Sequence, residues 1–318
     1  MDTALLISIL TITIAAGTSL VFATIGEILT ERAGILNLGV EGIMIMGAVT
    51  GFAAAFHSES AWVGVLTAIL VGGFLGLIHA FLTITLRADQ VVSGLALTLL
   101  GTGLASFLGQ RLGPDGSALV GLTGPRFEDI SIPGLSALPF LGESVFSQDI
   151  LVYLMYITVP ASWYFLYKTR PGLHLRAIGE SPQTADAMGI NVLGLRYFYT
   201  TIGGMLIGLG GVHLSLAYTP GWTENLTGGR GWIVIALVIF ATWNPARSVV
   251  GALLFGGVNA IQFRLQAIGT TIPASILNML PYILTIVVLV LITWLEAFRK
   301  RVGAPAALGL PYLREERS

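Results

Sequence analysis

Lys168-Thr-Arg-Pro-Gly-Leu-His-Leu-Arg-Ala-Ile-Gly-Glu-Ser-Pro-Gln-Thr-Ala-Asp-Ala-Met-Gly-Ile190 is the stretch that decides how this chain folds, because it is polar and lies between two long apolar runs. Those runs cover 150–167 and 198–217. Each has about the length that spans the hydrocarbon core of a bilayer. The whole polar segment, 168–197, holds four of the chain's sixteen Lys and Arg residues. The pattern predicts a loop that is held outside the membrane by another component.

Composition extends this interpretation to the whole chain. Hydrophobic residues make up 54% of the sequence and charged residues only 10%, and the mean hydropathy is +0.83. Such values are typical of an integral membrane protein. The forty glycines fit helices that pack closely through small residues, since lipid provides no hydrophobic drive for helices to associate. We therefore expect one all-α membrane domain over residues 1–318.

Nine apolar segments are candidate spans. They cover 4–26, 42–57, 61–86, 91–109, 150–167, 198–217, 231–243, 248–264 and 278–296. The first begins Met1-Asp2-Thr3 without a basic region, which argues against a cleaved signal peptide. The prediction is a polytopic helical bundle.

Lys and Arg in the connections predict the orientation, because cytoplasmic loops carry the excess of basic residues. The loop 168–197 and the tail 297–318 should be cytoplasmic; they contain Lys168, Arg170, Arg176, Arg196, Arg299, Lys300, Arg301, Arg314 and Arg317. The connection 110–149 is mainly acidic and should be external. Nine spans then place the amino terminus outside and the carboxyl terminus inside.

Several kinds of chemistry find no support in the sequence. There is no cysteine, and the four histidines have no metal-ligand spacing. No nucleophile, base and orienting group cluster together, so we expect no catalytic residues and no bound metal. Neither lysine lies in a phosphate-binding loop, which needs glycines before a Lys-Ser or Lys-Thr pair. A net charge of −1 gives no indication of nucleic-acid binding.

A polar interruption, 26–42, separates the first two spans. It is too polar for lipid and too apolar for a free loop, and glycines at 34, 39 and 42 surround Asn37 and Glu41. Irregular backbone at membrane depth survives only inside protein or beside water, so we expect a half-helix that enters the bundle here. Ionisable residues at such depth are functional candidates. Asn37 and Glu41 are candidate solute-pathway residues; equally, Glu41 could cap a helix start or pair with Arg32.

A second interruption, 222–232, precedes the seventh span, and a third, 242–247, follows it. Each half of the chain therefore has a glycine-rich start to a helix, approached from opposite sides, which is the pattern of an inverted repeat with broken half-helices. We add Asn225 and Asn259 as pathway candidates, although Asn259 and Gln262 are also typical of hydrogen bonds between helices. The tryptophans at 222, 232 and 243 are expected to be interfacial anchors.

The long polar loop contains a helix signature. Ser181-Pro182 followed by Gly189 predicts a short helix over 182–188, with a serine cap, a proline in the first turn and a glycine after the end. It would present Ala185, Met188 and Ile190 beside acidic residues, and 172–179 would form a second small turn. Such a patch suits docking into a partner's groove. The alternative is a solvated linker.

Two motifs resemble a known family. The run Glu31-Arg32-Ala33-Gly34-Ile35-Leu36-Asn37-Leu38-Gly39-Val40-Glu41-Gly42, with Leu175-Arg176-Ala177-Ile178-Gly179-Glu180-Ser181-Pro182 and the stretch 185–190, looks like permease subunits of ATP-binding-cassette importers. These belong to the branch that handles branched-chain amino acids, simple sugars and nucleosides. The first run is most similar to nucleoside-type permeases. A glycine-glycine-x-aspartate-leucine-serine pattern typical of sugar members is absent. The architecture resembles the vitamin B12 importer permease without its first helix.

The resemblance implies partners and roles. The loop would rest on a separate ABC ATPase subunit that binds the ATP, with this chain itself binding no cofactor. The residues implied in coupling are Arg176, Gly179, Glu180, Ser181, Pro182, Ala185, Asp186 and Gly189. A second permease subunit, a different chain, and an external binding protein would complete an importer in the bacterial inner membrane, among membrane lipids. The expected solute is a nucleoside or purine-like compound. Alternatives are sugar or branched-chain amino acid import, or ion-coupled transport through Glu41.

Overall fold

The helices form where the sequence is continuously apolar, because in lipid each backbone N–H and C=O must be satisfied within its own segment. The computed structural model describes residues 3–136, 138–267, 272–277, 279–296 and 303–313, and within them seven helices are long and apolar enough to cross a membrane. They are α1 (Thr3–Arg32), α2 (Val40–Ser58), α3 (Ala61–Ala80) with a π-helical extension (Phe81–Thr85), α4 (Gln90–Gly109), α6 (Ile150–Lys168), α9 (Val192–His213) with a π-helical extension (Leu214–Tyr218), and α11 (Pro245–Ala267). Two further apolar helices are shorter: α10 (Arg230–Phe240), which precedes α11, and α13 (Leu280–Glu296), which follows it. Each of the nine predicted spans overlaps one of these helices.

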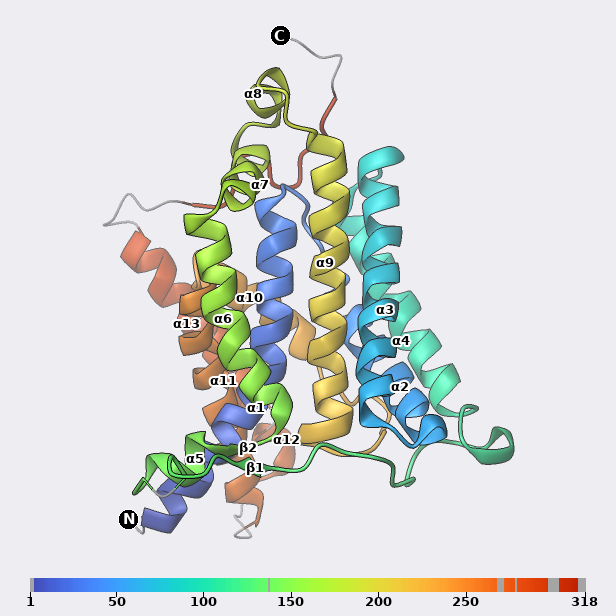
Figure 1. Ribbon diagram of the computed structural model, residues 1–318, viewed down its shortest axis with the longest axis vertical. Coiled ribbons are helices and arrows are strands. Elements are labelled where there is room, and N and C mark those ends of the chain that lie inside the picture. The colour runs from blue at the N-terminus through green and yellow to red at the C-terminus, as the bar shows by residue number, and fades with distance from the viewer. Residues whose placement is uncertain (1–2, 137, 268–271, 278, 297–302, 314–318) are drawn as a thin grey trace.

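The remaining elements lie at the two ends of the bundle (Figure 1). One end carries α7 (Arg170–Glu180) and α8 (Pro182–Ala187), with the described part of the C-terminal tail beside them; we name it the α7–α8 end. The other carries the N-terminus and the segment 110–149, which contains a 3-10 turn (Pro114–Gly116), α5 (Leu141–Val145) and two antiparallel strands; we name it the 110–149 end. The strands β1 (Ile130–Ser131) and β2 (Ser147–Gln148) pair Ile130 with Gln148. A last short helix is α12 (Ala274–Leu277).

Glycine contacts hold the central helices together. A Cβ built on Gly211 of α9 would lie 2.0 Å from the carbonyl oxygen of Met44 in α2. A Cβ on Gly72 of α3 would lie 2.3 Å from the carbonyl oxygen of Gly204 in α9. Only glycine allows backbones to approach this closely, and such contacts replace the missing hydrophobic drive in lipid. The high glycine content is therefore used where α2 and α3 pack against α9.

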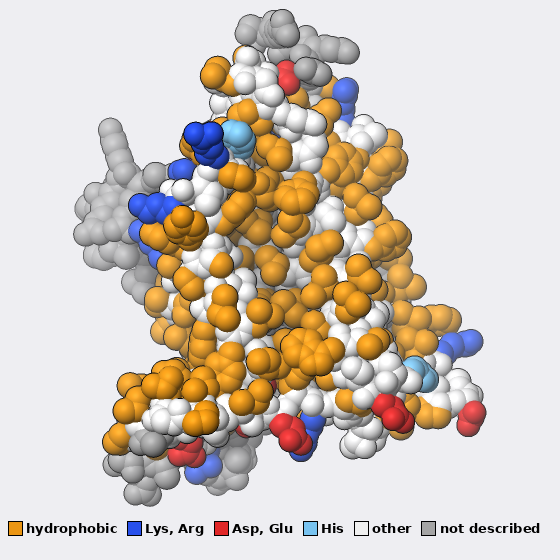
Figure 2. All heavy atoms as spheres, viewed as in Figure 1, with side chains coloured by type: hydrophobic (Ala, Val, Ile, Leu, Met, Phe, Trp, Pro, Cys, Tyr) orange, Lys and Arg blue, Asp and Glu red, His pale blue; other side chains and the backbone are white. Residues whose placement is uncertain are grey.

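The outer surface is apolar along the flanks of the bundle. On the face in Figure 2, hydrophobic side chains cover the sides, and the charged side chains gather toward the two ends. α3 and its π-helical extension expose Trp62, Leu66, Leu70, Phe74, Leu77 and Phe81. This distribution is that of a lipid-facing surface with water at both ends.

Some expectations about local structure were wrong. The segment 26–42 does not contain a separate half-helix: α1 continues to Arg32, a turn covers 33–39, and α2 begins at Val40. The helix tolerates its polar end because Glu27 accepts a hydrogen bond from the backbone N–H of Asn37 at 3.1 Å. Likewise 172–179 is part of the 11-residue helix α7 rather than a small turn. The C-terminal basic residues at 299–301, 314 and 317 lie outside the described residues.

Candidate functional site

The first turn of α10 lies beside the middle of α1. The guanidinium of Arg230, the first residue of α10, donates to the carbonyl oxygen of Ala16 at 3.0 Å and to Ser19 Oγ at 3.3 Å. These residues lie about halfway along α1. From there α10 runs to the α7–α8 end, where the indole of Trp243 donates to Glu31 near the end of α1 at 2.5 Å. α10 is thus a half-helix, as predicted for the second half of the chain.

Glu41, in the first turn of α2, joins the start of α2 to the start of α10. Its Oε1 accepts hydrogen bonds from Thr227 Oγ1 at 2.5 Å and from the Gly229 N–H at 3.0 Å, and its Oε2 accepts from the Gly231 N–H at 2.6 Å. The side chain is 4% exposed. α2 then runs to the 110–149 end, where His57 contacts the carbonyl oxygen of Leu112 at 2.7 Å. The two helices therefore diverge from one buried carboxyl group, and we name this place the Glu41 junction.

The local sequence explains this geometry. Gly228 and Gly229 have φ values of +54° and +82°, which glycine adopts without strain. A Cβ on Gly231 would lie 2.4 Å from both Cα and N of Glu41. The first N–H groups of a helix have no partner within it and carry the positive end of the helix dipole. The glycines thus bring two such helix starts against one carboxyl group.

Glu41 has the contacts of a cap, and it caps α10 through residues about 190 positions away. The alternative, a pairing of Glu41 with Arg32, is not formed: the guanidinium of Arg32 donates to the carbonyl oxygen of Trp243 at 3.3 Å. Trp243 is 7% exposed and Trp222 is 1% exposed, so these two are buried rather than interfacial anchors.

The other pathway candidates lie on separate elements. Asn37 is buried in the α1–α2 turn, where its side-chain oxygen accepts from the Gly39 N–H at 2.9 Å. Asn225 is exposed in the loop before α10, with φ of +57°, and Asn259 is half-buried in α11. Of these, Asn225 is nearest in sequence to a residue that contacts Glu41, because it lies two residues before Thr227. Its carbonyl oxygen accepts a hydrogen bond from the Gly228 N–H.

A polar stripe on α4 was missed by the sequence analysis. Thr98, Thr102, Ser106 and Gln110 follow at intervals of four residues, which places successive members near one another on the helix surface. The amide of Gln110 donates to Glu224 at 2.9 Å, in the loop that leads to the Glu41 junction. Two aromatic residues adjoin the same junction: Trp232 follows Gly231 in α10, and the Tyr282 hydroxyl donates to the Gly228 carbonyl oxygen at 2.9 Å. Trp232 is 41% exposed and Tyr282 is 44% exposed. The four-residue spacing was a signal that could have revealed the stripe.

At the α7–α8 end the predicted coupling residues divide into buried and exposed groups. The Thr169 side chain caps α7 by accepting from the Gly172 N–H at 3.2 Å. A Cβ on Gly179 would lie 2.2 Å from the carbonyl oxygen of Arg32, so α7 touches the end of α1. The guanidinium of Arg176 lies 5.4 Å from the centre of the Tyr167 ring. These contacts are internal to the chain.

Around α8, Glu180 and Gly189 are exposed, Ser181 and Asp186 are half-buried, and Pro182 and Ala185 are buried. The expected patch of Ala185, Met188 and Ile190 is therefore wrong for Ala185, whereas Met188 is 78% exposed. The predicted helix is present over Pro182–Ala187, one residue shorter than 182–188. The Ser181 hydroxyl contacts Thr184 Oγ1 at 2.7 Å instead of capping a backbone N–H.

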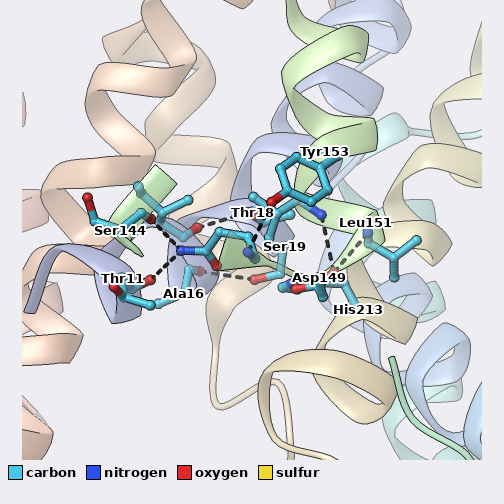
Figure 3. Close-up of polar contacts among 12 residues, drawn as sticks. Thr11, Ala16, Thr18, Ser19, Ser144, Asp149, Leu151, Tyr153 and His213 are labelled. Atoms are coloured by element: carbon cyan, nitrogen blue, oxygen red, sulfur yellow. Dashed lines mark hydrogen bonds and ion pairs between the residues drawn. The ribbon is translucent and has the colours of Figure 1, made fainter. Parts of the chain in front are cut away.

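A further polar cluster ties the 110–149 end together (Figure 3). The Asp149 carboxylate caps α6 by accepting from the Leu151 N–H at 2.8 Å, and it lies 3.6 Å from the ring of His213. Gln148 donates to the carbonyl oxygens of Ser144 and Thr11 at 2.7 and 3.4 Å. Burial alone would raise the pKa of Asp149, but His213 and the backbone N–H donors outweigh it, and the pKa lies below its ordinary value.

Comparison with known proteins assigns the chain to a family. The family model described as "Branched-chain amino acid transport system / permease component" matches residues 8–291. This chain belongs to that family of permeases. Within the described residues we find no group of three His, Asp or Glu that could hold a metal ion.

The permease is similar to several curated transporters along almost its full length. A putative glucose ABC transporter permease of Haloferax volcanii is 41% identical and covers 96% of this chain and 98% of its own length. A nucleoside ABC transporter permease of Lactococcus lactis is 36% identical over 94% of each chain. A guanosine ABC transporter permease of Bacillus subtilis is 34% identical over 96% of each chain. The permease is therefore a membrane subunit of an ABC importer.

A solved structure supports the fold. It is described as an inward-facing conformation of a putative metal-chelate type ABC transporter, with a TM-score of 0.50, 18% sequence identity, and coverage of 89% of this chain and 84% of that chain. At this identity the likeness concerns the fold alone.

Proposed function

We propose that this permease moves a nucleoside or a purine-like solute across a plasma membrane, driven by ATP on a separate ATPase subunit and supplied by an external binding protein. The observation that carries the solute is the similarity, over nearly the full length of each chain, to relatives named as nucleoside and guanosine permeases. The Glu31–Gly42 run points the same way.

Side chains near the Glu41 junction suit such a solute. On the α4 stripe, Thr98 is buried, but Thr102, Ser106 and Gln110 are partly or fully exposed. Their hydroxyl and amide groups can hydrogen-bond a ribose or a base without an ion pair. The exposed rings of Trp232 and Tyr282 can stack against a base, since base–aromatic stacking contributes about 1–3 kcal/mol. We propose a solute pathway past these groups and Asn225, with Glu41 and Asn37 holding the backbone behind it.

We propose that the α7–α8 end faces the cytoplasm. Lys168, Arg170 and Arg87 lie at the ends of helices there, whereas acidic residues predominate in the segment 110–149. This orientation places the exposed part of α7 and α8, with Glu180, Met188 and Gly189, against the ATPase, and the 110–149 end toward the binding protein. The N-terminus is then external. A different permease chain would complete the membrane unit, as the nucleoside-type resemblance implies.

The second candidate solute is a sugar, because the relative at 41% identity is named as a putative glucose permease. The deciding experiment reconstitutes the permease with its ATPase, its partner permease and its binding protein in liposomes, and measures ATP-driven uptake of labelled guanosine and labelled glucose. Uptake of guanosine, competed by unlabelled nucleosides and not by glucose, supports the proposal. Uptake of glucose alone overturns it in favour of the sugar.

Ion-coupled transport through Glu41 is less well supported. Both carboxylate oxygens of Glu41 already accept hydrogen bonds from Thr227, Gly229 and Gly231. A proton-carrying group that cycles would have to break these contacts in each turnover. Uptake by the permease alone in liposomes, under a proton gradient and without ATP, would contradict the ATP-driven proposal.

A further inference from the structure

The end of the described chain packs against the α7–α8 end. Residues 303–313 follow the last membrane helix, and we name them the tail segment. Pro305, Ala307 and Tyr312 in it are buried, while Leu310 is 57% exposed. A tail that stayed in water would leave all of these side chains exposed, whereas three of the four are buried. The tail segment is thus part of the folded protein.

The tail segment contacts three different elements. The Ala307 N–H donates to the carbonyl oxygen of Gly179 in α7 at 2.9 Å, and the Gly309 N–H donates to that of Gly34 in the α1–α2 turn at 3.3 Å. Arg196 of α9, which is 2% exposed, donates to the carbonyl oxygen of Leu310 at 3.4 Å. Its guanidinium lies 5.9 Å from the centre of the Tyr312 ring. The tail segment therefore bridges α7, the α1–α2 turn and α9.

The same segment completes a cavity with the coupling helices. A cavity of about 180 Å³ lies between the end of α7, the start of α8 and the tail, and its lining residues are Glu180, Pro182, Gln183, Ala306, Ala307, Leu310 and Pro311. A cavity of about 150 Å³ can hold a benzene ring. The space is thus sufficient for one large side chain from a partner. Its lining includes the apolar side chains of Pro182, Leu310 and Pro311, the amide of Gln183 and the carboxylate of Glu180. The Glu180 carboxylate accepts from the Ala306 N–H at 3.4 Å.

We propose that the tail segment and the α7–α8 elements form one composite docking surface for the ATPase subunit, and that the tail segment transmits the movement of α7 to the α1–α2 turn. This rests on the proposed function, in which α7 and α8 meet the ATPase. The occupant follows from continuity: the cavity has Glu180, Pro182 and Gln183 of the predicted coupling loop on one side and the tail on the other. A protein that covers α8 must also cover Leu310 and Pro311.

The mechanical part follows from the order of contacts. Gly179 touches both the tail, through its carbonyl oxygen, and the end of α1, where a Cβ on it would reach the Arg32 carbonyl oxygen. The tail touches the α1–α2 turn at Gly34. Seven residues after Gly34 comes Glu41, which holds the starts of α2 and α10 together. A displacement of α7 by the ATPase would therefore reach the Glu41 junction through packed and hydrogen-bonded backbone.

The docking claim is tested with three single variants in the assembled importer. Leu310→Glu places a charge on the tail side of the surface, Met188→Glu places one beside α8, and Leu135→Glu changes a leucine of 43% exposure at the 110–149 end as a matched control. The measurement is recovery of the ATPase subunit with the tagged permease from detergent. We expect roughly tenfold weaker binding of the ATPase for Leu310→Glu and Met188→Glu, as for loss of an interface hot spot, and no change for Leu135→Glu.

The transmission claim needs a different variant. Ala307→Pro removes the N–H that bonds to Gly179, whereas Ala304→Pro, in the exposed start of the tail segment, is the control. The measurement is solute transported per ATP hydrolysed in liposomes, beside the melting midpoint of each variant. We expect Ala307→Pro to keep the ATPase subunit bound and to lower transport per ATP, with the Ala304→Pro ratio unchanged. A purely structural role would lower the melting midpoint and both activities together.

The outcomes separate this inference from the proposed function. Normal ATPase recovery with Leu310→Glu, together with loss of recovery with Met188→Glu, overturns the composite surface and leaves the α8 docking intact. If the unchanged permease recovers no ATPase subunit at all, the proposed function itself fails. An unchanged transport-to-ATP ratio in Ala307→Pro overturns the transmission role of the tail segment.

Discussion

Glu41→Gln is the sharpest test of the Glu41 junction. The substitution keeps the size of the side chain but replaces one carboxylate oxygen with an NH2 group. Oε1 accepts two hydrogen bonds and Oε2 accepts one, from the Gly231 N–H at 2.6 Å. The better orientation of the amide keeps its oxygen at the Oε1 position, so that its NH2 group faces the Gly231 N–H, and two donors then oppose each other.

The expected loss follows from these contacts. Leaving one buried donor without an acceptor costs about 1–3 kcal/mol. The two helix starts also lose the negative charge that favours their dipoles, typically about 0.3–1 kcal/mol each, while the neutral amide avoids part of the cost of burying a charge. We therefore expect the free energy of unfolding to fall by about 2 kcal/mol, which is roughly a thirtyfold change in the unfolding equilibrium.

The assay is equilibrium unfolding of the purified permease in mixed detergent micelles, followed by tryptophan fluorescence. Glu224→Gln is the matched control, since Glu224 is an exposed carboxylate that accepts from Gln110. It should lie within about 0.5 kcal/mol of the unchanged protein, as surface changes usually do. Equal stability of the two variants would refute the reasoning, because the buried carboxyl group would then not hold α2 and α10 together.

Three further predictions concern packing and pH. Gly101→Ala places a Cβ 2.5 Å from the Gly42 carbonyl oxygen and should destabilise the permease by about 1–3 kcal/mol, whereas Gly103→Ala in the same helix meets open space and should be neutral or slightly stabilising; unfolding curves compare them directly. Gly179→Ala, with a Cβ 2.2 Å from the Arg32 carbonyl oxygen, should separate α7 from α1 and lower solute-stimulated ATPase activity; unchanged stimulation would contradict the contact. Because the pKa of Asp149 is lowered in the fold, its carboxylate stabilises the protein above the ordinary Asp pKa of about 4, and that contribution is lost as the pH falls through the lowered pKa. The melting midpoint of Asp149→Asn should therefore lie below that of the unchanged protein at about pH 7 and approach it toward about pH 3; a constant difference would argue against the effect.

The positions of the spanning helices could be predicted from the sequence, because the cost of placing polar residues in lipid depends on each segment separately. The same holds for α8, whose proline and glycine act within a few residues. The end of α1 could not be predicted this way. Glu27, Glu31 and Arg32 look like the start of a loop, but they are helical and buried. Glu27 accepts a hydrogen bond from Asn37, Glu31 accepts one from Trp243, and Arg32 donates one to Trp243.

By itself, then, the sequence determined the membrane class, the nine helical segments, the polar loop with α8 and the resemblance to ABC permeases, all of which rest on local composition and short motifs. Only the tertiary structure decided what the polar residues do. Glu41 meets Gly231 across 190 positions, and Ala307 meets Gly179 through a close backbone approach that no local pattern encodes. The physical reason is that burial of a polar group in a bundle is tolerated only when a specific partner reaches it, and that partner is set by how helices pack rather than by neighbours in the chain.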